Sequence, residues 1–223
     1  MTKKYNFKKD NFCVIKNAIS IEFAEFFFNY FLMKKQVYDT CSSQKYISPY
    51  EKILGYYEGP NDQVPDTYTS YSDIAMETLL LKLKPIMEKT TNLKLIPNYT
   101  YARVYKRGDE LKRHKDRFSC EISTTLNLGG DPWPIYIEPD SKKGKFVEQG
   151  YQTEMTKGVQ VDLAPGDMLV YRGNILEHWR ESFDFNTCVQ VFLHYNNAAT
   201  AGSEENKFDR RPHLGLPNWF KKQ

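Results

Sequence analysis

The chain is 223 residues long, which is enough for one well-buried domain and short for two. Hydrophobic residues make up 40% and charged residues 26% of the sequence, an ordinary balance for a globular protein. The formal net charge of +3 is small, and the basic residues are interleaved with acids, which argues against nucleic-acid binding. We therefore expect a single domain over residues 1–223 and no nucleic-acid partner.

The sequence also lacks the patterns of membrane and secreted proteins. Its longest apolar stretch, Phe23 to Met33, is interrupted by polar residues and is too short to span a bilayer. The N-terminal segment, Met1 to Asn6, is basic and has no apolar run typical of a signal peptide. The four cysteines lie far apart with no CxxC pair, which fits neither a zinc ribbon nor a dense disulfide framework. These features predict a soluble, cytoplasmic protein without a membrane partner.

The first part of the chain is predicted to contain two helices. A short strand over Asn11 to Asn17 precedes an amphipathic helix over about Ser20 to Lys35, for which Ser20 is a suitable N-cap. The stretch from Tyr38 to Tyr71 has no sustained period and predicts a loop with short structured pieces. A second helix over about Asp73 to Thr90 is indicated by apolar residues at three- and four-residue steps.

After the second helix, the pattern changes to short segments rich in Tyr, Val, Ile and Thr, separated by Gly and Pro turns. These predicted strands lie at 97–105, 120–128, 133–138, 158–163, 167–171, 175–179 and 188–195. Helices followed by strands predict an α+β fold, in which helical support over about 1–95 backs an antiparallel core over about 96–196. A tail over about 197–223 is expected to pack on the surface, and the Lys- and Gly-rich segment 139–158 is expected to be a mobile loop near a site entrance.

The residues that indicate chemistry are His114, Asp116 and His178. In an extended segment, the side chains of His114 and Asp116 leave the same face, because strand side chains alternate. Two histidines and one carboxylate on one face of an octahedral metal leave three positions open, which suits non-haem Fe(II) oxygen chemistry. Zinc is more often held by three or four His or Cys ligands. An isolated HxD tripeptide is a weak signal, so its context matters.

That context consists of YxxGxxxxxHxD over Tyr105 to Asp116, PGDMLVY over Pro165 to Tyr171, and then His178. Together they resemble the double-stranded β-helix core (a jelly roll, cupin-like) of the Fe(II)/2-oxoglutarate-dependent dioxygenases, and within that superfamily the prolyl-4-hydroxylase-like branch. The likeness covers about Tyr99 to Tyr195. The N-terminal half is similar only in its general plan of helices that support the barrel.

The resemblance implies that His114, Asp116 and His178 are iron ligands and that Tyr105 lines the 2-oxoglutarate pocket. It implies Fe(II) as cofactor, with 2-oxoglutarate and O₂ as cosubstrates. The activity it implies is hydroxylation of a C–H bond in a peptide, a protein side chain or an amino acid.

One position departs from the pattern of that branch. There, a Lys or Arg roughly ten residues after the second histidine pairs with the far carboxylate of 2-oxoglutarate. Here the corresponding position is near Cys188, with Gln190 the next inward residue, and neither is basic. A dicarboxylate in a partly buried pocket needs a charged donor. Arg180 shares strand parity with His178 and is predicted to point inward as this donor, with Asn127 and Gln190 as assisting neutral donors.

Other polar residues support weaker hypotheses. Arg103 and Arg117 are alternative anchors for the dicarboxylate, and a surface position at a strand end is the competing interpretation of Arg180. His194 on the last predicted strand is expected to be a hydrogen-bonded interior residue rather than a metal ligand. The segment around His213, in which Pro and Gly fix the chain, is expected to be a docking tail.

Two other classes of protein remain open at this point. A non-catalytic, cupin-like metal- or ligand-binding barrel would keep the triad without a working cosubstrate pocket, and the missing basic residue near Cys188 favours it. A purely structural jelly roll would make the spacing of the three potential ligands a coincidence. A zinc hydrolase is remote, because the sequence lacks HExxH and a third histidine placed to complete a zinc site.

Overall fold

A computed structural model describes residues 4–148 and 150–222 of the chain. Met1 to Lys3 in the basic N-terminal segment, Gln149 in the predicted mobile loop, and Gln223 lie outside the described residues. The helices are α1 (Phe7–Asp10), α2 (Ile21–Ser43) and α3 (Ile74–Thr91). The strands are β1 (Phe12–Ile15), β2 (Tyr56–Tyr57), β3 (Tyr68–Tyr71), β4 (Leu95–Lys106), β5 (Leu111–His114), β6 (Ile122–Gly130), β7 (Ile135–Ile137), β8 (Lys145–Val147), β9 (Gly150–Gln152), β10 (Val159–Val161), β11 (Met168–Tyr171), β12 (His178–Arg180) and β13 (Thr187–Asn197).

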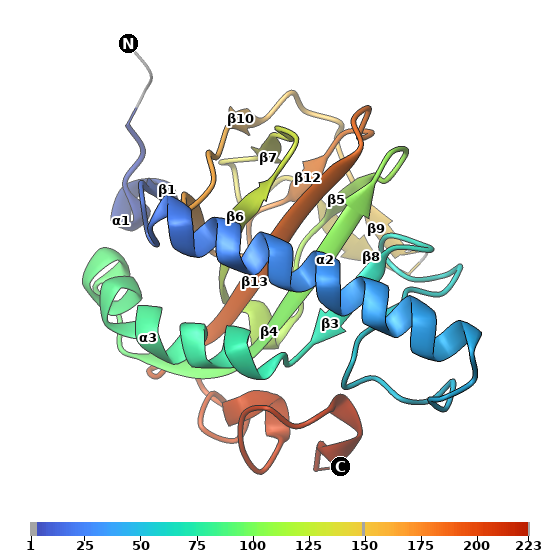
Figure 1. The fold of residues 1–223 in the computed structure, drawn as a ribbon. Coiled ribbons are helices and arrows are strands. Elements are labelled where there is room, and N and C mark those ends of the chain that lie inside the picture. The colour runs from blue at the N-terminus through green and yellow to red at the C-terminus, as the bar shows by residue number, and fades with distance from the viewer. Residues whose placement is uncertain (1–3, 149, 223) are drawn as a thin grey trace.

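Two antiparallel sheets form the core of the molecule (Figure 1). The larger sheet has the strand order β1-β11-β6-β13-β4-β3-β2, and the smaller sheet has the order β10-β7-β12-β5. Helices α2 and α3 cross the outer face of the larger sheet, over β6, β13 and β4 (Figure 1). The predicted α+β class, with a jelly-roll core backed by N-terminal helices, is therefore confirmed.

Side chains of β13 alternate between the helix-covered face of the larger sheet and the interior of the barrel. Val189, Val191 and Leu193 point toward the helices, where they join one large apolar cluster with residues of α2 and α3. Cys188 and Phe192, one residue out of step, join a different cluster inside the barrel. The larger sheet is therefore buried on both faces, and its inner face is free to carry the polar groups of a site.

Helix α2 begins where the sequence predicted, since the Ser20 hydroxyl accepts the amide of Phe23 at 3.2 Å as an N-cap. The predicted end at Lys35 is wrong, because the helix continues to Ser43. Tyr38 packs its ring against Tyr57 and Tyr68, at 5.9 and 5.8 Å between centroids. These distant contacts sustain the helix beyond the point where its own sequence period fades.

Other boundaries also differ from the prediction. The strand expected at 175–179 begins only at His178, and β5, which starts at Leu111, was not among the predicted strands. The predicted loop over 139–158 contains the β8–β9 hairpin. Helix α1 and the strand β3 were not predicted, because both are short and owe their stability to neighbours distant in sequence.

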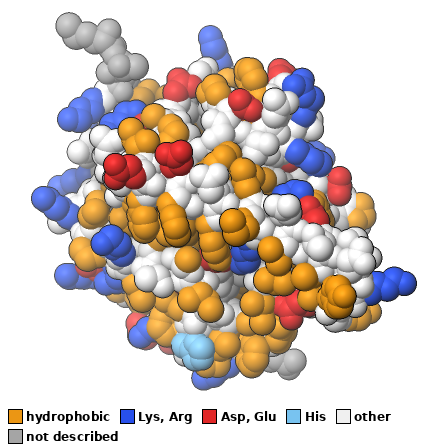
Figure 2. All heavy atoms as spheres, viewed as in Figure 1, with side chains coloured by type: hydrophobic (Ala, Val, Ile, Leu, Met, Phe, Trp, Pro, Cys, Tyr) orange, Lys and Arg blue, Asp and Glu red, His pale blue; other side chains and the backbone are white. Residues whose placement is uncertain are grey.

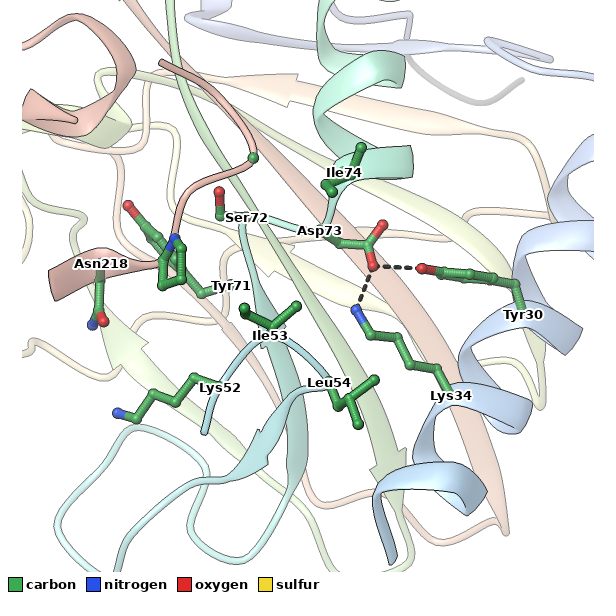
Figure 3. A pocket seen from close by; sticks show the side chains of 12 residues that line it. Tyr30, Lys34, Lys52, Ile53, Leu54, Tyr71, Ser72, Asp73, Ile74 and Asn218 are labelled. Atoms are coloured by element: carbon green, nitrogen blue, oxygen red, sulfur yellow. Dashed lines mark hydrogen bonds and ion pairs between the residues drawn. The ribbon is translucent and has the colours of Figure 1, made fainter. Parts of the chain in front are cut away.

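Asp73 joins the two long helices. Its carboxylate caps α3 by accepting the amides of Ala75 and Met76, at 3.0 and 3.1 Å. The same carboxylate accepts from the Tyr30 hydroxyl at 2.7 Å and from the Lys34 ammonium, both on α2 (Figure 3). A cavity of about 180 Å³ lies beside this junction. It contains none of the predicted metal ligands.

The outer surface of α2 carries exposed hydrophobic side chains, and Figure 2 shows them gathered over the helical face of the molecule. They include Ile21, Phe26 and Met33, each more than half exposed. Within residues 4–148 and 150–222, no helix combines the length and the apolar character needed to cross a bilayer.

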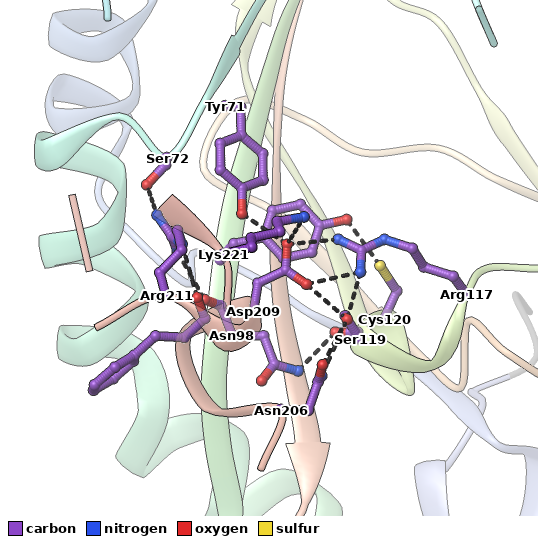
Figure 4. Close-up of polar contacts among 12 residues, drawn as sticks. Tyr71, Ser72, Asn98, Arg117, Ser119, Cys120, Asn206, Asp209, Arg211 and Lys221 are labelled. Atoms are coloured by element: carbon purple, nitrogen blue, oxygen red, sulfur yellow. Dashed lines mark hydrogen bonds and ion pairs between the residues drawn. The ribbon is translucent and has the colours of Figure 1, made fainter. Parts of the chain in front are cut away.

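Asp209 fixes the C-terminal tail to the barrel (Figure 4). Its buried carboxylate accepts two hydrogen bonds from the Arg117 guanidinium, at 2.7 and 2.8 Å. It also accepts from the hydroxyls of Tyr71 and Ser119, at 2.7 and 2.8 Å, and pairs with the Lys221 ammonium at 2.6 Å. Burial alone would raise the pKa of Asp209, but these donors hold it below the ordinary aspartate value.

We expect Asp209→Asn to lower the free energy of unfolding by about 3 kcal/mol, because it removes one partner from a buried group of charges. Lys143→Gln is the control, since it breaks a more exposed pair with Glu154 and should lower the free energy of unfolding much less. Urea unfolding at neutral pH measures both. Equal losses in the two variants would contradict the role assigned to Asp209.

The same carboxylate predicts a pH dependence. Because its pKa is lower in the folded than in the unfolded protein, its stabilising contribution is complete above the unfolded value of about 3.9. That contribution is lost as the pH falls through the folded-state pKa. We therefore expect the stability difference between wild type and Asp209→Asn to narrow as the pH falls below about 4. A difference that stays constant down to the acid unfolding limit would contradict this assignment.

Candidate metal centre

The pairing of β5 with β12 brings the predicted metal ligands together. His114 and His178 are directly opposite each other in this pair, with ring centroids 4.2 Å apart. Oδ1 of Asp116 lies 3.5 Å from Nε2 of His114 and 3.6 Å from Nε2 of His178. The three donor atoms therefore face a common point, although the residues come from segments about sixty positions apart in the sequence.

Asp116 lies beyond the end of β5 and is held by other means. Its backbone amide donates to the carbonyl of Gly173 at 2.9 Å. The hydroxyl of Ser123 donates to Oδ2 of Asp116 at 2.9 Å, which leaves Oδ1 directed at the two imidazoles. Of the HxD tripeptide only His114 belongs to β5, so the alternation of strand side chains does not by itself place Asp116. The two side chains nevertheless converge.

Backbone carbonyls fix the tautomer of both histidines. Nδ1 of His114 lies 2.7 Å from the carbonyl of Lys112, and Nδ1 of His178 lies 3.0 Å from the carbonyl of Leu176. A carbonyl can only accept, so each Nδ1 carries the proton. Each Nε2 therefore presents a lone pair toward Asp116, as a metal-ligating histidine requires.

The charges of the cluster favour a cation. Burial and the neighbouring His178 lower the pKa of His114, so its imidazole is neutral near pH 7. Burial alone would raise the pKa of Asp116, but the two histidines hold it well below the ordinary value. The result is an ionised carboxylate and a neutral His114 imidazole beside His178, and these three residue types are the donor set of a facial 2-His-1-carboxylate site.

The triad lines a cavity of about 140 Å³ between the two sheets. The segment before β3 folds over it, because Gln63 lines its rim and accepts from the Arg103 guanidinium at 2.9 Å. Arg103 is also paired with the buried Glu58 at 2.6 Å. The other lining residues are Tyr99, Tyr101, Leu111, Cys120, Tyr171, Phe192 and His194.

Arg180 is completely enclosed in the same barrel, with 1% of its surface exposed, so the alternative of a surface arginine is wrong. One guanidinium nitrogen donates to the carbonyl of Trp133, and another lies 3.4 Å from the hydroxyl of Thr125. Its Nε has no hydrogen-bond partner. No ion pair within residues 4–148 and 150–222 involves it, and burial lowers its pKa. A buried guanidinium without a carboxylate is costly, so this position calls for an anion.

The remaining predicted cosubstrate contacts occupy the inner wall near Arg180. Tyr105 is fully buried and packs edge-on against Trp133, with centroids 4.7 Å apart. Asn127 and Gln190 are bonded to each other at 3.1 Å. Asn127 also donates to the carbonyl of Leu163 at 2.7 Å, so its amide is largely engaged within the protein. The competing anchors are paired elsewhere: Arg103 with Glu58 and Arg117 with Asp209.

His194 is a hydrogen-bonded interior residue, as predicted, and its Nδ1 lies 3.0 Å from the hydroxyl of Ser123. The sequence did not point to Ser123, Tyr171 or Cys120, all of which contact the triad or line its cavity. Tyr171 ends the apolar strand that follows the Pro-Gly-Asp turn, and its ring packs on His178 at 4.7 Å. Its position at the end of that strand was the one available signal.

Tyr151 and Thr153, in the second half of the predicted loop, contact a residue next to the triad. Glu177, the residue before His178, accepts from the Tyr151 hydroxyl at 2.8 Å and from the Thr153 hydroxyl at 2.9 Å. The guanidinium of Arg113, the residue before His114, donates to the same carboxylate at 3.1 Å. The hairpin is therefore attached to the residues that directly precede the two histidines.

Comparisons with known proteins agree on the fold. No family model matches the sequence, and no curated protein is detectably similar to it. Among solved structures, the non-haem α-ketoglutarate-dependent epimerase SnoN of nogalamycin biosynthesis is similar with a TM-score of 0.63 at 12% identity, covering 95% of this chain and 89% of its own. HygX from Streptomyces hygroscopicus, solved with nickel and 2-oxoglutarate, gives 0.58 at 13% identity, covering 86% and 85%. A prolyl-4-hydroxylase from Pseudomonas putida gives 0.52 at 11% identity, covering 86% and 96%.

Gly173→Ala tests the placement of Asp116 without removing a donor. A Cβ at Gly173 would lie 2.1 Å from Oδ2 of Asp116, so the carboxylate must move. We expect Mn(II) or Fe(II) binding to weaken 10- to 100-fold, the range typical of changes next to a metal ligand. Equilibrium dialysis with metal analysis measures this, with His114→Ala as the variant that should lose the metal altogether.

Gly59→Ala is the matched control, because a Cβ there meets only Asp62 at 3.4 Å. Its metal affinity should equal that of the wild type. Full metal occupancy in both Gly173→Ala and His114→Ala would contradict the assignment of the triad.

Proposed function

We propose that this chain, which has the double-stranded β-helix fold of the Fe(II)/2-oxoglutarate oxygenases, is itself a non-haem Fe(II)- and 2-oxoglutarate-dependent dioxygenase. The observation that supports this most strongly is that the interior of one barrel holds two complementary groups. The first consists of the imidazoles and the carboxylate of His114, His178 and Asp116. The second is the buried guanidinium of Arg180, which forms no ion pair with a carboxylate among the described residues.

His114, Asp116 and His178 would hold the iron. Their Nε2 and Oδ1 atoms converge, both imidazoles are in the tautomer that a metal requires, and the carboxylate is ionised. Bound Fe(II) and 2-oxoglutarate would supply the activation of O₂ for oxidation of a C–H bond. The protein's own contribution is to orient these donors, through Ser123 and the carbonyls behind each imidazole, and to surround them with aromatic side chains that limit access of water.

Arg180 would pair with the far carboxylate of 2-oxoglutarate. It is two residues from His178 on the same strand, a separation of about 7 Å that a five-carbon dicarboxylate can span. Its guanidinium is also electrostatically coupled to the thiol of Cys188 and the hydroxyl of Tyr105. The related branch has a basic residue on its last strand, at the position of Cys188. Here the Arg180 guanidinium lies near Cys188, although it comes from β12.

Tyr105 would support the same carboxylate from the opposite wall. Burial raises the pKa of Tyr105, so its hydroxyl remains a proton donor at neutral pH. Gln190 accepts from the Thr125 hydroxyl at 3.2 Å, and Thr125 in turn lies beside Arg180. In this arrangement Asn127 and Gln190 position Thr125 and Arg180, and they are held too firmly by each other to be the main anchors.

The substrate would enter beside Gln63, the exposed residue of the cavity lining, and would contact Tyr99 and Tyr101. A volume of about 140 Å³ suits a side chain or a small molecule rather than a folded protein surface. We therefore propose that the oxidised group is a C–H bond of an amino acid, free or within a peptide or protein, as in prolyl hydroxylation.

A non-catalytic metal-binding barrel is the competing function. It was favoured by the lack of a basic residue near Cys188, and that argument weakens because Arg180 is beside Cys188 in space. In a barrel that binds only metal, the buried charge of Arg180 would destabilise the fold without any ligand to compensate it.

Arg180→Met distinguishes the two functions. Loss of one partner of a buried charge pair costs about 2 kcal/mol or more, so 2-oxoglutarate should bind at least about 30-fold more weakly. Metal affinity should be unchanged. Without 2-oxoglutarate, the variant should be no less stable than the wild type, because an unpaired buried charge has been replaced by an apolar side chain of similar length.

Thermal unfolding with Mn(II), with and without 2-oxoglutarate, measures all three properties. Arg107→Met is the control for binding, because that arginine is exposed. If Arg180→Met is still stabilised by 2-oxoglutarate as strongly as the wild type, the anchor lies elsewhere. If 2-oxoglutarate stabilises neither protein while both bind metal, the non-catalytic barrel is the better account.

A further inference from the structure

A second group of potential metal ligands lies beside the triad. Asp116, Cys120 and His194 each present a donor atom, and these atoms all lie within 4.8 Å of one another. Cys120 and His194 are buried, with 3% and 6% of their surfaces exposed. Both line the same cavity as His114 and His178. We propose that this group is a second metal position, which shares Asp116 with the iron position and prefers a thiophilic divalent cation such as Zn²⁺.

The donor set decides the preference. A thiolate, an imidazole and a carboxylate are the ligands that Zn²⁺ takes in proteins, whereas the triad offers no sulfur. Zinc–sulfur and zinc–nitrogen bonds of about 2.3 and 2.0 Å bring tetrahedral ligand atoms to roughly 3.5 Å from one another. The three donor atoms lie within 4.8 Å of one another, so they must move closer together when the cation binds.

The hydrogen bonds around the cluster leave its donors available. Ser123 has a single hydroxyl proton, which it directs to the acceptor oxygens of Asp116 and of the Cys120 backbone, each at 2.9 Å. It must therefore accept from Nδ1–H of His194, at 3.0 Å. Nε2 of His194 then keeps its lone pair. The Cys120 sulfur lies 3.0 Å from the hydroxyl of Tyr99, a donor that can remain bonded to a metal-bound thiolate.

The surrounding charge does not oppose a cation. The nearest guanidinium belongs to Arg117, which stacks over Tyr99 with its Cζ 4.7 Å from the ring centroid. Its charge is balanced by the bidentate pair with Asp209 (Figure 4). Figure 4 also shows Cys120 at the edge of this network. Asp209 in the tail thus neutralises the charge of Arg117.

Sharing Asp116 has a functional consequence. One oxygen of this carboxylate faces the two imidazoles of the triad, and the other faces Ser123. An ion held by Cys120 and His194 draws on the same carboxylate and lies in the cavity through which substrate must enter. Zinc at this position would therefore act against iron-dependent turnover without replacing the iron at His114 and His178.

Cobalt(II) provides the test, because a thiolate bound to Co(II) gives an intense near-ultraviolet charge-transfer absorption that imidazole and carboxylate ligands do not give. Metal-free, reduced protein is titrated with Co(II) without oxygen. We expect the band in the wild type and in Cys13→Ser, which removes a buried cysteine that packs in the apolar cluster with α2 and α3 and does not line the cavity. We expect it to be absent in Cys120→Ser, and Zn²⁺ should bleach it in the wild type.

The double variant His114→Ala/His178→Ala separates this proposal from the proposed function, because it removes the iron position but keeps the second group. The band should persist in it. Loss of the band in this double variant would mean that the thiol merely adds to the triad metal, which overturns a distinct position. A wild-type protein without the band, or a Cys120→Ser protein that keeps it, would also overturn the proposal. Thermal unfolding of each metal-free variant shows that it is folded.

Discussion

The pairing of β5 with β12 is the constraint on which the site depends. It sets His114 opposite His178, and a carboxylate that lies just outside the strand completes the group. A shift of one residue in this register would turn one imidazole away from the other. The register is held from outside as well, because Glu177 and Arg113, the residues that precede the two histidines, are bonded to each other at 3.1 Å. The chemistry of the cavity therefore rests on backbone pairing and on an ion pair that is not in the cavity.

The buried arginines of this barrel differ in whether a carboxylate neutralises their charge, and this difference indicates which of them has a functional role. Three arginines are buried in the part of the chain that the structure describes: Arg103, Arg180 and Arg211. Arg103 and Arg211 are each paired with a glutamate, at 2.6 and 2.7 Å. Among the described residues, Arg180 has a carbonyl, a hydroxyl and the ring of Trp133 as partners, and none of them carries a negative charge. An uncompensated cation is favourable where a ligand supplies the anion, and Arg180 lies on the same strand as the proposed metal ligand His178.

The sequence predicted those parts of the structure that follow from local rules. Alternation along strands indicated that Arg180 points inward with His178, and helix periodicity with Ser20 as a cap located the start of α2. It did not predict the length of α2, which depends on the rings of Tyr57 and Tyr68. Nor did it indicate Ser123, a small residue whose role comes from contacts with Asp116 and His194 that only the folded chain creates. The roles of the triad and of Arg180 remain predictions of this geometry.

The most direct test of the proposed function is an anaerobic titration of the Fe(II)-loaded protein with 2-oxoglutarate, monitored by visible absorption. Chelation of iron by the keto and carboxylate oxygens of 2-oxoglutarate produces a weak metal-to-ligand charge-transfer band. We predict that the band appears and saturates at one 2-oxoglutarate per bound iron. Iron demonstrably bound at His114, Asp116 and His178, with no band at saturating 2-oxoglutarate, would contradict the account and identify the barrel as a binding module.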